Sequence, residues 1–464
     1  MNRFEIKNRV YIKNPHKNIV RKAESELRII NPKWLENQRM GRWNGRTSKM
    51  LEFYNLDENG NISMPRGLAG EYIRFCRERD FLYEIVDKRL CLEDIDFEFE
   101  GSLKPFQKIA MNNILKKDFG TLNAPTGSGK TVMALYAIFM RKQPCLIIVH
   151  TRDLARQWME RAAQFLKIEQ SEIGLIGAGK KRVGEKITIG LVQSLVKYKA
   201  MLKGRVGHVI VDECHRTPSK TFTSVLNYFD SKYLLGLSAT PYRRDNLSSL
   251  IFWHLGPIRH VINKEALEIK GDIIQAEPVF RSTEFKPFHD PVTQYSKMMT
   301  ELVSDDDRNR QIAEDIAAEY RRKGGHILVL SDRKKHCENI CSILKFRHKI
   351  EAYVFTGDLS EKKRKDVLEK LISKKDNIII ATGQLIGEGF DCKTLSTLFL
   401  ATPVNFSGRL IQYLGRVLRP SPEKTTARVY DYVDINVSIL RRSALNRARI
   451  YGLKELPFFM EDIF

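Results

Sequence analysis

Most of the chain consists of short, continuous runs of apolar residues, separated by polar segments and by stretches with helical spacing. One group of runs occupies residues 145–150, 187–192, 208–212 and 233–239. A second group occupies residues 326–332, 351–357, 377–383, 397–402 and 427–434. Continuous Val, Ile and Leu runs that alternate with helices are typical of a parallel sheet covered on both faces. We therefore predict an α/β fold with two parallel-sheet units in tandem.

Residues 1–100 show a different pattern. Residues 3–14 alternate apolar and polar positions like a pair of strands, and residues 69–79 have helical spacing. The Asn-Gly pairs at 44–45 and 59–60 mark tight turns of the hairpin kind. This combination predicts a small α+β domain at the N-terminus.

The length agrees with this division, because 464 residues at roughly 150 per domain suggest about three domains. We predict an accessory domain over residues 1–100 and parallel-sheet domains over residues 101–262 and 301–464. Three prolines within residues 263–300 predict a connector between the two larger domains.

The charge balance indicates the kind of partner. Lys and Arg number 78 against 56 Asp and Glu, which gives a formal net charge of +22. Such an excess favours a polyanion, and nucleic acid is the first candidate. The seven cysteines are odd in number and scattered, which argues against a secreted disulfide scaffold and for a cytoplasmic protein. No run approaches the ~18 apolar residues of a membrane span, so we expect no membrane partner.

The segment that carries the clearest chemistry is residues 124–131, Ala-Pro-Thr-Gly-Ser-Gly-Lys-Thr, after an apolar stretch and before a helical pattern. It resembles a phosphate-binding loop, although Ala124 stands where the strict pattern has glycine. Backbone N–H groups of such a loop and the following helix N-terminus attract phosphate. Lys130 would reach the β- and γ-phosphates of ATP, and Thr131 would ligate Mg²⁺. The nucleotide-binding candidates here are Thr126, Gly127, Ser128, Gly129, Lys130 and Thr131. The alternative is a glycine-rich turn that only caps a helix.

A pair of carboxylates follows the apolar run that ends near residue 211. Asp212 and Glu213 open the sequence Asp-Glu-Cys-His. Carboxylates at the carboxyl end of a parallel strand lie where ligands bind in α/β proteins. Asp212 would hold Mg²⁺, and Glu213 would orient or deprotonate the attacking water.

Two arginines three positions apart mark a third candidate site in the second unit. Arg416 and Arg419 share one face of a predicted helix, four and seven positions after Gln412. An arginine that reaches a γ-phosphate across a cleft accelerates phosphoryl transfer. The alternative is a basic helix face in solvent.

These segments together resemble the superfamily 2 nucleic-acid helicases and translocases. The family's motifs correspond to residues 124–131, 150–158, 212–215, 238–240, 381–391 and 412–420, in the family's order. The resemblance implies two RecA-like domains, ATP and Mg²⁺ as cofactors, and catalytic roles for Lys130, Asp212, Glu213, Gln412, Arg416 and Arg419. Residues 412–419 look most like the branch that contains the XPB, UvsW and restriction-type translocases. A DEAD-box RNA helicase would differ at residues 212–215 and in its last motif.

The resemblance also implies binding roles. Gln107 would contact adenine, and Gly387 and Asp391 would line the nucleotide cleft. Ser238 and Thr240 would couple the nucleotide state to strand binding, and His215 would link the Mg²⁺ site to the second domain. The implied contacts to nucleic acid are Arg152, Gln193, Ser194, Arg244, Thr356, Gly357 and Glu388.

Aromatic and cationic residues are interleaved in the N-terminal domain, in a composition suited to base stacking and phosphate contact. They are Trp34, Arg39, Arg42, Trp43, Arg46 and Lys49. We take Arg42 and Trp43 as nucleic-acid contacts, since the domain resembles accessory domains that recognise branched or duplex DNA. The alternative is that Trp34 and Trp43 belong to a core and the arginines to a solvated surface.

The functional expectation is an ATP-dependent DNA helicase that acts as a monomer, without sequence preference, on forks and junctions in replication, recombination or repair, including branch migration. Phosphate gripping is blind to sequence and sensitive to salt, which suits such an activity. The alternatives are a duplex-DNA translocase that does not separate strands, an ATP-gated nucleic-acid sensor and an RNA helicase.

Overall fold

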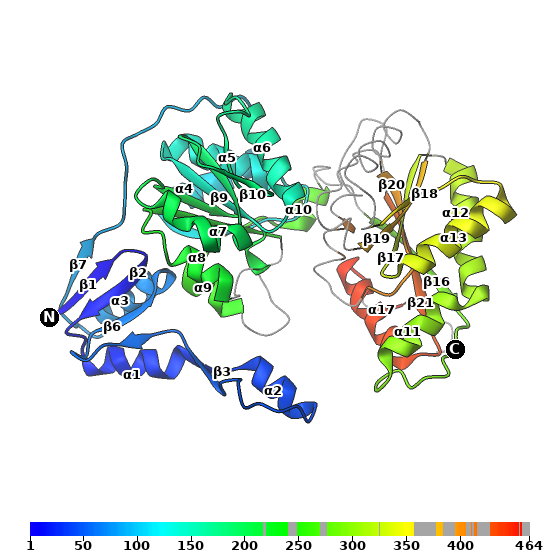
Figure 1. Ribbon diagram of the computed structural model, residues 1–464, viewed down its shortest axis with the longest axis horizontal. Coiled ribbons are helices and arrows are strands. Elements are labelled where there is room, and N and C mark those ends of the chain that lie inside the picture. Colours follow the sequence, from blue (N-terminus) through cyan, green and yellow to red (C-terminus); the bar gives the residue numbers. More distant parts are fainter. Residues whose placement is uncertain are drawn as a thin grey trace. The chain divides into compact units, whose positions relative to one another are not determined.

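The computed structural model (Figure 1) describes residues 1–216, 220–239, 248–269, 276–323, 325–356, 377–383, 395–404, 410, 413–414, 427–453 and 455–456. The chain divides into two compact units, and each has its own sheet and core. The first unit holds residues 1–125 and 129–262, and the second holds residues 126–128 and 263–464. Within the described part of the chain, no helix is long and apolar enough to cross a bilayer.

A small mixed sheet begins the first unit, with the strand order β5-β6-β2-β1-β7. Its strands are β1 (Asn2–Ile6), β2 (Arg9–Lys13), β5 (Asn55–Leu56), β6 (Ile62–Pro65) and β7 (Tyr83–Asp87). Alternate residues of β1 and β2 meet α1 (Lys17–Glu26) and α3 (Ala69–Arg77) in one core. The predicted strand pair, helix and α+β character are therefore confirmed, and β5 and β6 form the hairpin predicted at the second Asn-Gly pair.

An arm projects from this sheet between α1 and β5, as Figure 1 shows. It consists of β3 (Arg28–Ile30), α2 (Pro32–Arg39) and β4 (Met50–Glu52), and β3 pairs with β4 in an antiparallel two-stranded sheet. No residue of α2 is buried. The arm thus folds without a core of its own.

The N-terminal sheet is docked on the rest of the first unit by a short 3-10 helix, Arg66–Leu68. The buried Arg66 guanidinium donates to the carbonyl oxygen of Ser231 at 2.6 Å. Gly67 lies against the end of α9 (Ser248–Leu255), where any side chain would overlap the Phe252 carbonyl. Trp253 of α9 contacts the N-terminal core. These contacts fix the small sheet to the larger domain.

Residues 90–100, which we expected to close the accessory domain, pack on the larger one. The backbone of Leu90 pairs with Asp230 and Lys232, and Phe99 lies in a cluster of rings with Tyr136, Phe139 and Phe165. Apolar side chains in this stretch therefore belong to the larger domain.

Eight strands form the main sheet of the first unit, in the order β11-β10-β12-β9-β13-β14-β8-β15. Neighbouring strands are parallel except β10 and β11. The strands are β8 (Phe119–Asn123), β9 (Cys145–Val149), β10 (Gly174–Gly177), β11 (Lys180–Arg182), β12 (Ile187–Leu191), β13 (His208–Val211), β14 (Tyr233–Ser238) and β15 (Ile258–Val261). The predicted parallel sheet is confirmed.

Helices cover this sheet. They are α4 (Pro105–Leu115), α5 (Lys130–Arg141), α6 (Arg152–Leu166), α7 (Val192–Tyr198) and α8 (Lys220–Leu226), in addition to α9. A buried cluster that includes Leu195, Phe222 and Val225 packs α7 and α8 against β9, β13 and β14. Strands buried on both faces need no polar alternation, which explains the continuous apolar runs.

The described residues of the second unit form a six-stranded sheet in which every neighbouring pair is parallel, in the order β16-β21-β20-β17-β19-β18. The strands are β16 (Ala276–Thr283), β17 (His326–Ser331), β18 (Tyr353–Phe355), β19 (Asn377–Thr382), β20 (Leu395–Leu400) and β21 (Ala427–Asp434). The described helices are α10 (Lys264–Ile269), α11 (Tyr295–Ser304), α12 (Asp306–Lys323), α13 (Lys334–His348) and α17 (Ser438–Ile450). All five predicted runs form strands.

Part of the expected connector contributes to this sheet. Residues 263–300 contain α10, β16 and the start of α11. β16 is an edge strand, where Pro278 is tolerated because one side of the strand needs no hydrogen-bonded neighbour.

Two buried ion pairs hold the last strand in place. Arg308 of α12 donates to Asp434 at 2.8 Å, and Arg447 of α17 forms a bidentate pair with Asp431 at 2.7–3.0 Å. Both carboxylates are fully buried, and Thr283 also donates to Asp434. The pairs fix β21 between α12 and α17.

Candidate active site

Five neighbouring parallel strands of the first unit end in succession at one edge of the sheet. In sheet order these are β12, β9, β13, β14 and β8. The predicted residues at or just after their carboxyl ends are, in the same order, Gln193 with Ser194, Arg152, Asp212, Ser238 and the loop at 124–131. Ligands bind outside this edge in open α/β sheets. The topology therefore brings residues that are up to 114 positions apart in the chain to one edge.

The loop at 124–131 turns directly from β8 into α5. Gly127 and Gly129 have φ angles of 88° and 84°, in the left-handed region that favours glycine. The Lys130 ammonium donates to the carbonyl oxygen of Ala124 at 3.1 Å, inside the loop. A side chain at Gly129 would overlap the amide nitrogen of Gln107 in α4. The expected adenine contact thus lies against the loop.

Asp212 lies at the end of β13 and is buried. One carboxylate oxygen accepts from the backbone N–H of Glu213 at 2.9 Å, and the other accepts from the indole N–H of Trp158 at 2.8 Å. Burial and the adjacent Glu213 carboxylate raise the pKa of Asp212 to about 6, against the lowering effect of Trp158 and Lys130. A cation bound beside Asp212 would stabilise its ionised form and so lower this pKa.

Sequence reasoning did not assign a role to Trp158. This residue is buried on α6, 54 positions before its carboxylate partner. In the sequence, Trp158 could have been singled out because it lies in the segment at residues 150–158, which is one of those that carry the family resemblance. Only the packing of α6 on the sheet reveals the contact.

Glu213 and His215 connect the end of β13 with the end of β14. Glu213 has a φ of 48°, which is uncommon for a residue with a side chain and often marks functional sites. The His215 Nδ1 atom lies 3.3 Å from the Glu213 carboxylate and 3.1 Å from the hydroxyl of Ser238. A change at the Glu213 carboxylate can therefore reach the end of β14 through His215.

The donor set near the loop fits Mg²⁺ better than a transition metal. Within the described ranges there is no group of three or more His, Cys, Asp and Glu residues placed to hold a metal ion. The oxygen atoms of Thr131 and Asp212 are hard ligands, and Mg²⁺ usually takes one or two protein oxygens together with substrate phosphates and water.

The expected nucleic-acid contacts of the first unit are accessible. Arg152 and Gln193 are exposed, and Ser194 is half-buried. In the second unit Thr356 follows β18 and is buried. The remaining predicted residues lie outside the described part of the chain, so their interpretation stays a prediction: Thr240, Arg244, Gly357, Gly387, Glu388, Asp391, Gln412, Arg416 and Arg419.

The two N-terminal tryptophans do not form a core. Trp34 is half-buried, with the Lys49 ammonium 5.3 Å from its ring centroid. Trp43 is 78% exposed, and Arg42 beside it is also exposed. The alternative that both rings are core residues is therefore wrong, because the arm has no interior to hold them.

Comparisons with known proteins agree with this geometry. The family described as "Type III restriction enzyme, res subunit" matches residues 100–243, and the "Helicase conserved C-terminal domain" family matches residues 309–421. A protein of Acanthamoeba polyphaga mimivirus with the provisional name ATP-dependent RNA helicase L396 is 27% identical over 76% of this chain and 68% of its own length. The ATP-dependent DNA helicase uvsW of Enterobacteria phage T4 is 24% identical over 94% of this chain and 92% of its own.

A solved structure supports the fold. The yeast protein Dbp5, bound to RNA and ADP BeF3, aligns over 84% of this chain and 93% of its own, with a TM-score of 0.54 and 15% identity. The two parallel sheets of this chain are RecA-like. The chain belongs to superfamily 2 of the helicases, and it is an ATP-dependent helicase or translocase.

Proposed function

We propose that this chain is a DNA helicase that uses ATP and Mg²⁺ to unwind or remodel branched DNA, such as forks and junctions, in replication, recombination or repair. The observation that carries the proposal is the placement of Lys130, Asp212 and Glu213 at one edge of a single parallel sheet. Phosphate, metal and water can meet there.

Each residue has a chemical task in this proposal. Lys130 and the N–H groups of its loop bind the β- and γ-phosphates of ATP. Thr131 and Asp212 would hold Mg²⁺, and Trp158 orients Asp212 through the indole N–H. Bound Mg²⁺ would neutralise charge on the phosphate oxygens. Glu213 orients the attacking water and accepts its proton.

The second unit would complete the reaction. The family resemblance implies that Arg416 and Arg419 stabilise the charge of the transferred phosphoryl group and that Gln412 also takes part in catalysis. His215 connects the Glu213 carboxylate with Ser238, and this contact passes the nucleotide state to the residues that grip the strand.

The preference for DNA has its own support. The phage T4 relative, a DNA helicase by name, matches nearly the whole chain, including the N-terminal domain. The excess of 22 positive charges suits sequence-blind contact with phosphates. The mimivirus relative supports the second candidate, an RNA helicase.

Strand separation on forked DNA tests the proposal. The purified chain is incubated with ATP and Mg²⁺ on a labelled DNA fork, a linear DNA duplex and an RNA fork of the same sequence. We expect preferential opening of the DNA fork. Hydrolysis stimulated by DNA without strand release would instead support a duplex translocase, and activity confined to the RNA fork would refute the DNA assignment.

Two variants test the site. We expect Lys130→Ala and Glu213→Gln to abolish ATP hydrolysis while the fold and DNA binding persist, since both side chains lie at the sheet edge rather than in the core. Circular dichroism and DNA-binding assays provide the controls. Turnover at the wild-type rate in either variant would refute the assignment of the site.

A further inference from the structure

The arm at residues 28–52 is built in a way that neither ATP hydrolysis nor core packing explains. None of its residues is buried, although it contains two tryptophans and six other large apolar residues. It also carries six cationic side chains and only two acidic ones. An element that exposes apolar surface and positive charge together is suited to a partner with flat apolar faces and negative charge.

The base of the arm is a defined structure. β3 and β4 pair in register, and the Arg28 guanidinium lies 3.1 Å from the Glu52 carboxylate across them. Asn31 caps α2 by accepting from the N–H of Lys33, and its amide donates to the Ser48 carbonyl at 2.9 Å. One asparagine thus joins the two sides of the arm.

The tip is held by similar contacts. The Asn44 side chain donates to the Trp34 carbonyl and accepts from the Asn37 amide, both at 3.0 Å. A turn follows, in which the N–H of Thr47 donates to the Asn44 carbonyl. The backbone on either side of Trp43 is therefore fixed.

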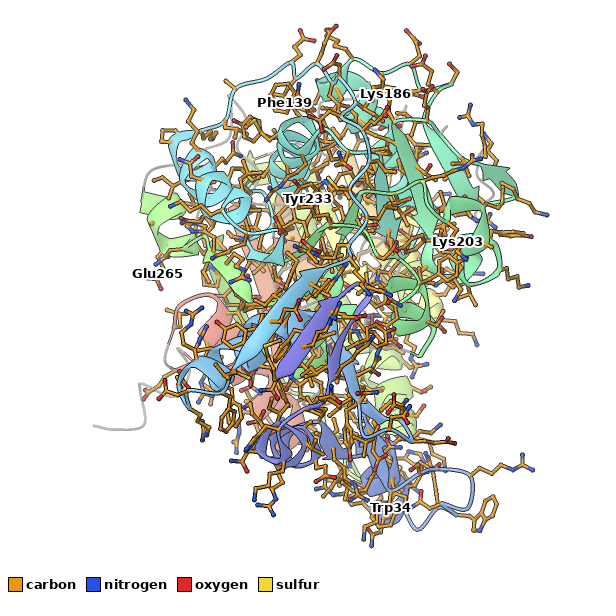
Figure 2. The ribbon with its side chains drawn as sticks, turned by 90° about the vertical axis from the view of Figure 1, so that its left-hand side faces the viewer. Trp34, Phe139, Lys186, Lys203, Tyr233 and Glu265 are labelled. Carbon is orange, nitrogen blue, oxygen red and sulfur yellow. The ribbon has the colours of Figure 1, made fainter. Side chains whose placement is uncertain are left out.

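The Trp43 ring itself is held on one side. A side chain at Gly45 would overlap the indole, so the ring lies directly against this glycine. Even so, 78% of Trp43 is exposed. Three cations, Arg39, Arg42 and Arg46, stand within four positions of it in the sequence. Figure 2 places Trp34, on the same arm, at the end of the first unit far from Tyr233 of the main sheet.

From these features we infer that the arm binds nucleic acid at an exposed base face, with Trp43 stacked on an unpaired or terminal base and the arginines on the adjoining phosphates. The inference rests on the proposed function and deepens it. In the interior of a duplex each base face is covered by its neighbour, so Trp43 finds a free face only at a fork, an end or a single strand. The arm would thereby favour branched over continuous duplex DNA.

Equilibrium binding tests this inference on the full chain without nucleotide. The probes are a fluorescent DNA fork with single-stranded arms and, as a competitor, a covalently closed circular duplex. We expect Trp43→Ala to weaken fork binding about 5- to 150-fold, the range for loss of one stacked base, and to leave competition by the circle unchanged. Trp43→Phe keeps a flat ring and should retain most of the affinity.

Two further variants separate charge from stacking. Arg42→Ala should weaken binding to both DNAs and reduce the dependence on salt by about one phosphate contact. Ile30→Ala, which removes an exposed but non-aromatic side chain at the base of the arm, is the matched control and should bind as the wild type does. Melting temperatures confirm that each variant is folded.

The outcomes distinguish this inference from the proposed function. Equal fork affinity of the wild type and Trp43→Ala would overturn the inference even if the wild type unwinds forks. Weaker fork binding by Trp43→Ala would support it even if the wild type binds forks without separating strands. A variant that changes only the oligomeric state would show that the arm binds a second copy of this chain, which also overturns the inference.

Discussion

The contact between Trp158 and Asp212 gives a prediction whose size follows from one hydrogen bond. The indole N–H donates to a buried carboxylate at 2.8 Å. A hydrogen bond to a charged group contributes about 1.5–3 kcal/mol. Partners that orient a metal ligand typically change metal affinity about 10- to 100-fold. We predict that Trp158→Phe raises the Mg²⁺ concentration for half-maximal ATP binding by about 10- to 100-fold.

The assay measures the metal directly as well as through the nucleotide. Mn²⁺ replaces Mg²⁺, and its binding is followed by electron paramagnetic resonance with a non-hydrolysable ATP analogue present. Phenylalanine keeps a ring in the same cavity but fills less of it, so we also expect a loss of about 1–2 kcal/mol in the free energy of unfolding. Measurements are therefore made well below the melting temperature.

A matched substitution separates the two effects. Trp253→Phe removes an indole that packs on Phe53, with 5.3 Å between ring centroids, in the contact between α9 and the N-terminal core. We expect it to lower stability and leave Mn²⁺ binding unchanged. If folded Trp158→Phe binds Mn²⁺ as tightly as the wild type, the hydrogen bond does not prepare Asp212 for the metal and the reasoning is wrong.

Three further outcomes follow from the described contacts. Arg447→Ala should lower the free energy of unfolding by about 3–5 kcal/mol, because it leaves the buried Asp431 carboxylate without its ion-pair partner. Urea denaturation measures this loss. The control is Arg449→Ala, at an exposed position of the same helix, which should change the free energy of unfolding by less than about 0.5 kcal/mol. Burial lowers the pKa of His336 to about 3, so the unfolded state takes up this proton first, and His336 alone should make stability fall by about 1.4 kcal/mol per pH unit as the pH drops below about 6.5. In a folded His336→Gln variant the slope of stability against pH should decrease by about that amount. Gly129→Ala should abolish binding of a fluorescent ATP analogue, while Gly60→Ala, also at positive φ but in open space, should bind normally.

Much of the fold could be predicted from the sequence, because strands buried on both faces produce apolar runs that remain visible in one dimension. The edge strands were harder. β16 contains a proline and is only partly buried, and β11 is entirely Lys and Arg. An edge strand is held mainly by backbone pairing with its one neighbour and not by burial of apolar side chains. Its amino-acid composition therefore gives little indication that it is a strand.

The site was predictable where its residues are neighbours in the chain. The loop before Lys130 and the carboxylates after β13 are local patterns, and their chemistry follows from residue type. Contacts between distant residues were not predictable, since the bond from Trp158 to Asp212 depends on how α6 packs. The two tryptophans of the arm illustrate the same limit, because composition left open whether Trp43 was a core residue or an exposed one.

The docking of the small sheet through Arg66 and Gly67 has a mechanical consequence. The N-terminal sheet is joined to the larger domain through a buried guanidinium and through a backbone contact that leaves no room for a side chain. Such a joint is rigid, unlike a flexible linker. Any rotation of the first RecA-like domain is then transmitted without slack to the base of the arm. Because displacement grows with distance from the pivot, a small rotation at the sheet becomes a longer stroke at Trp43.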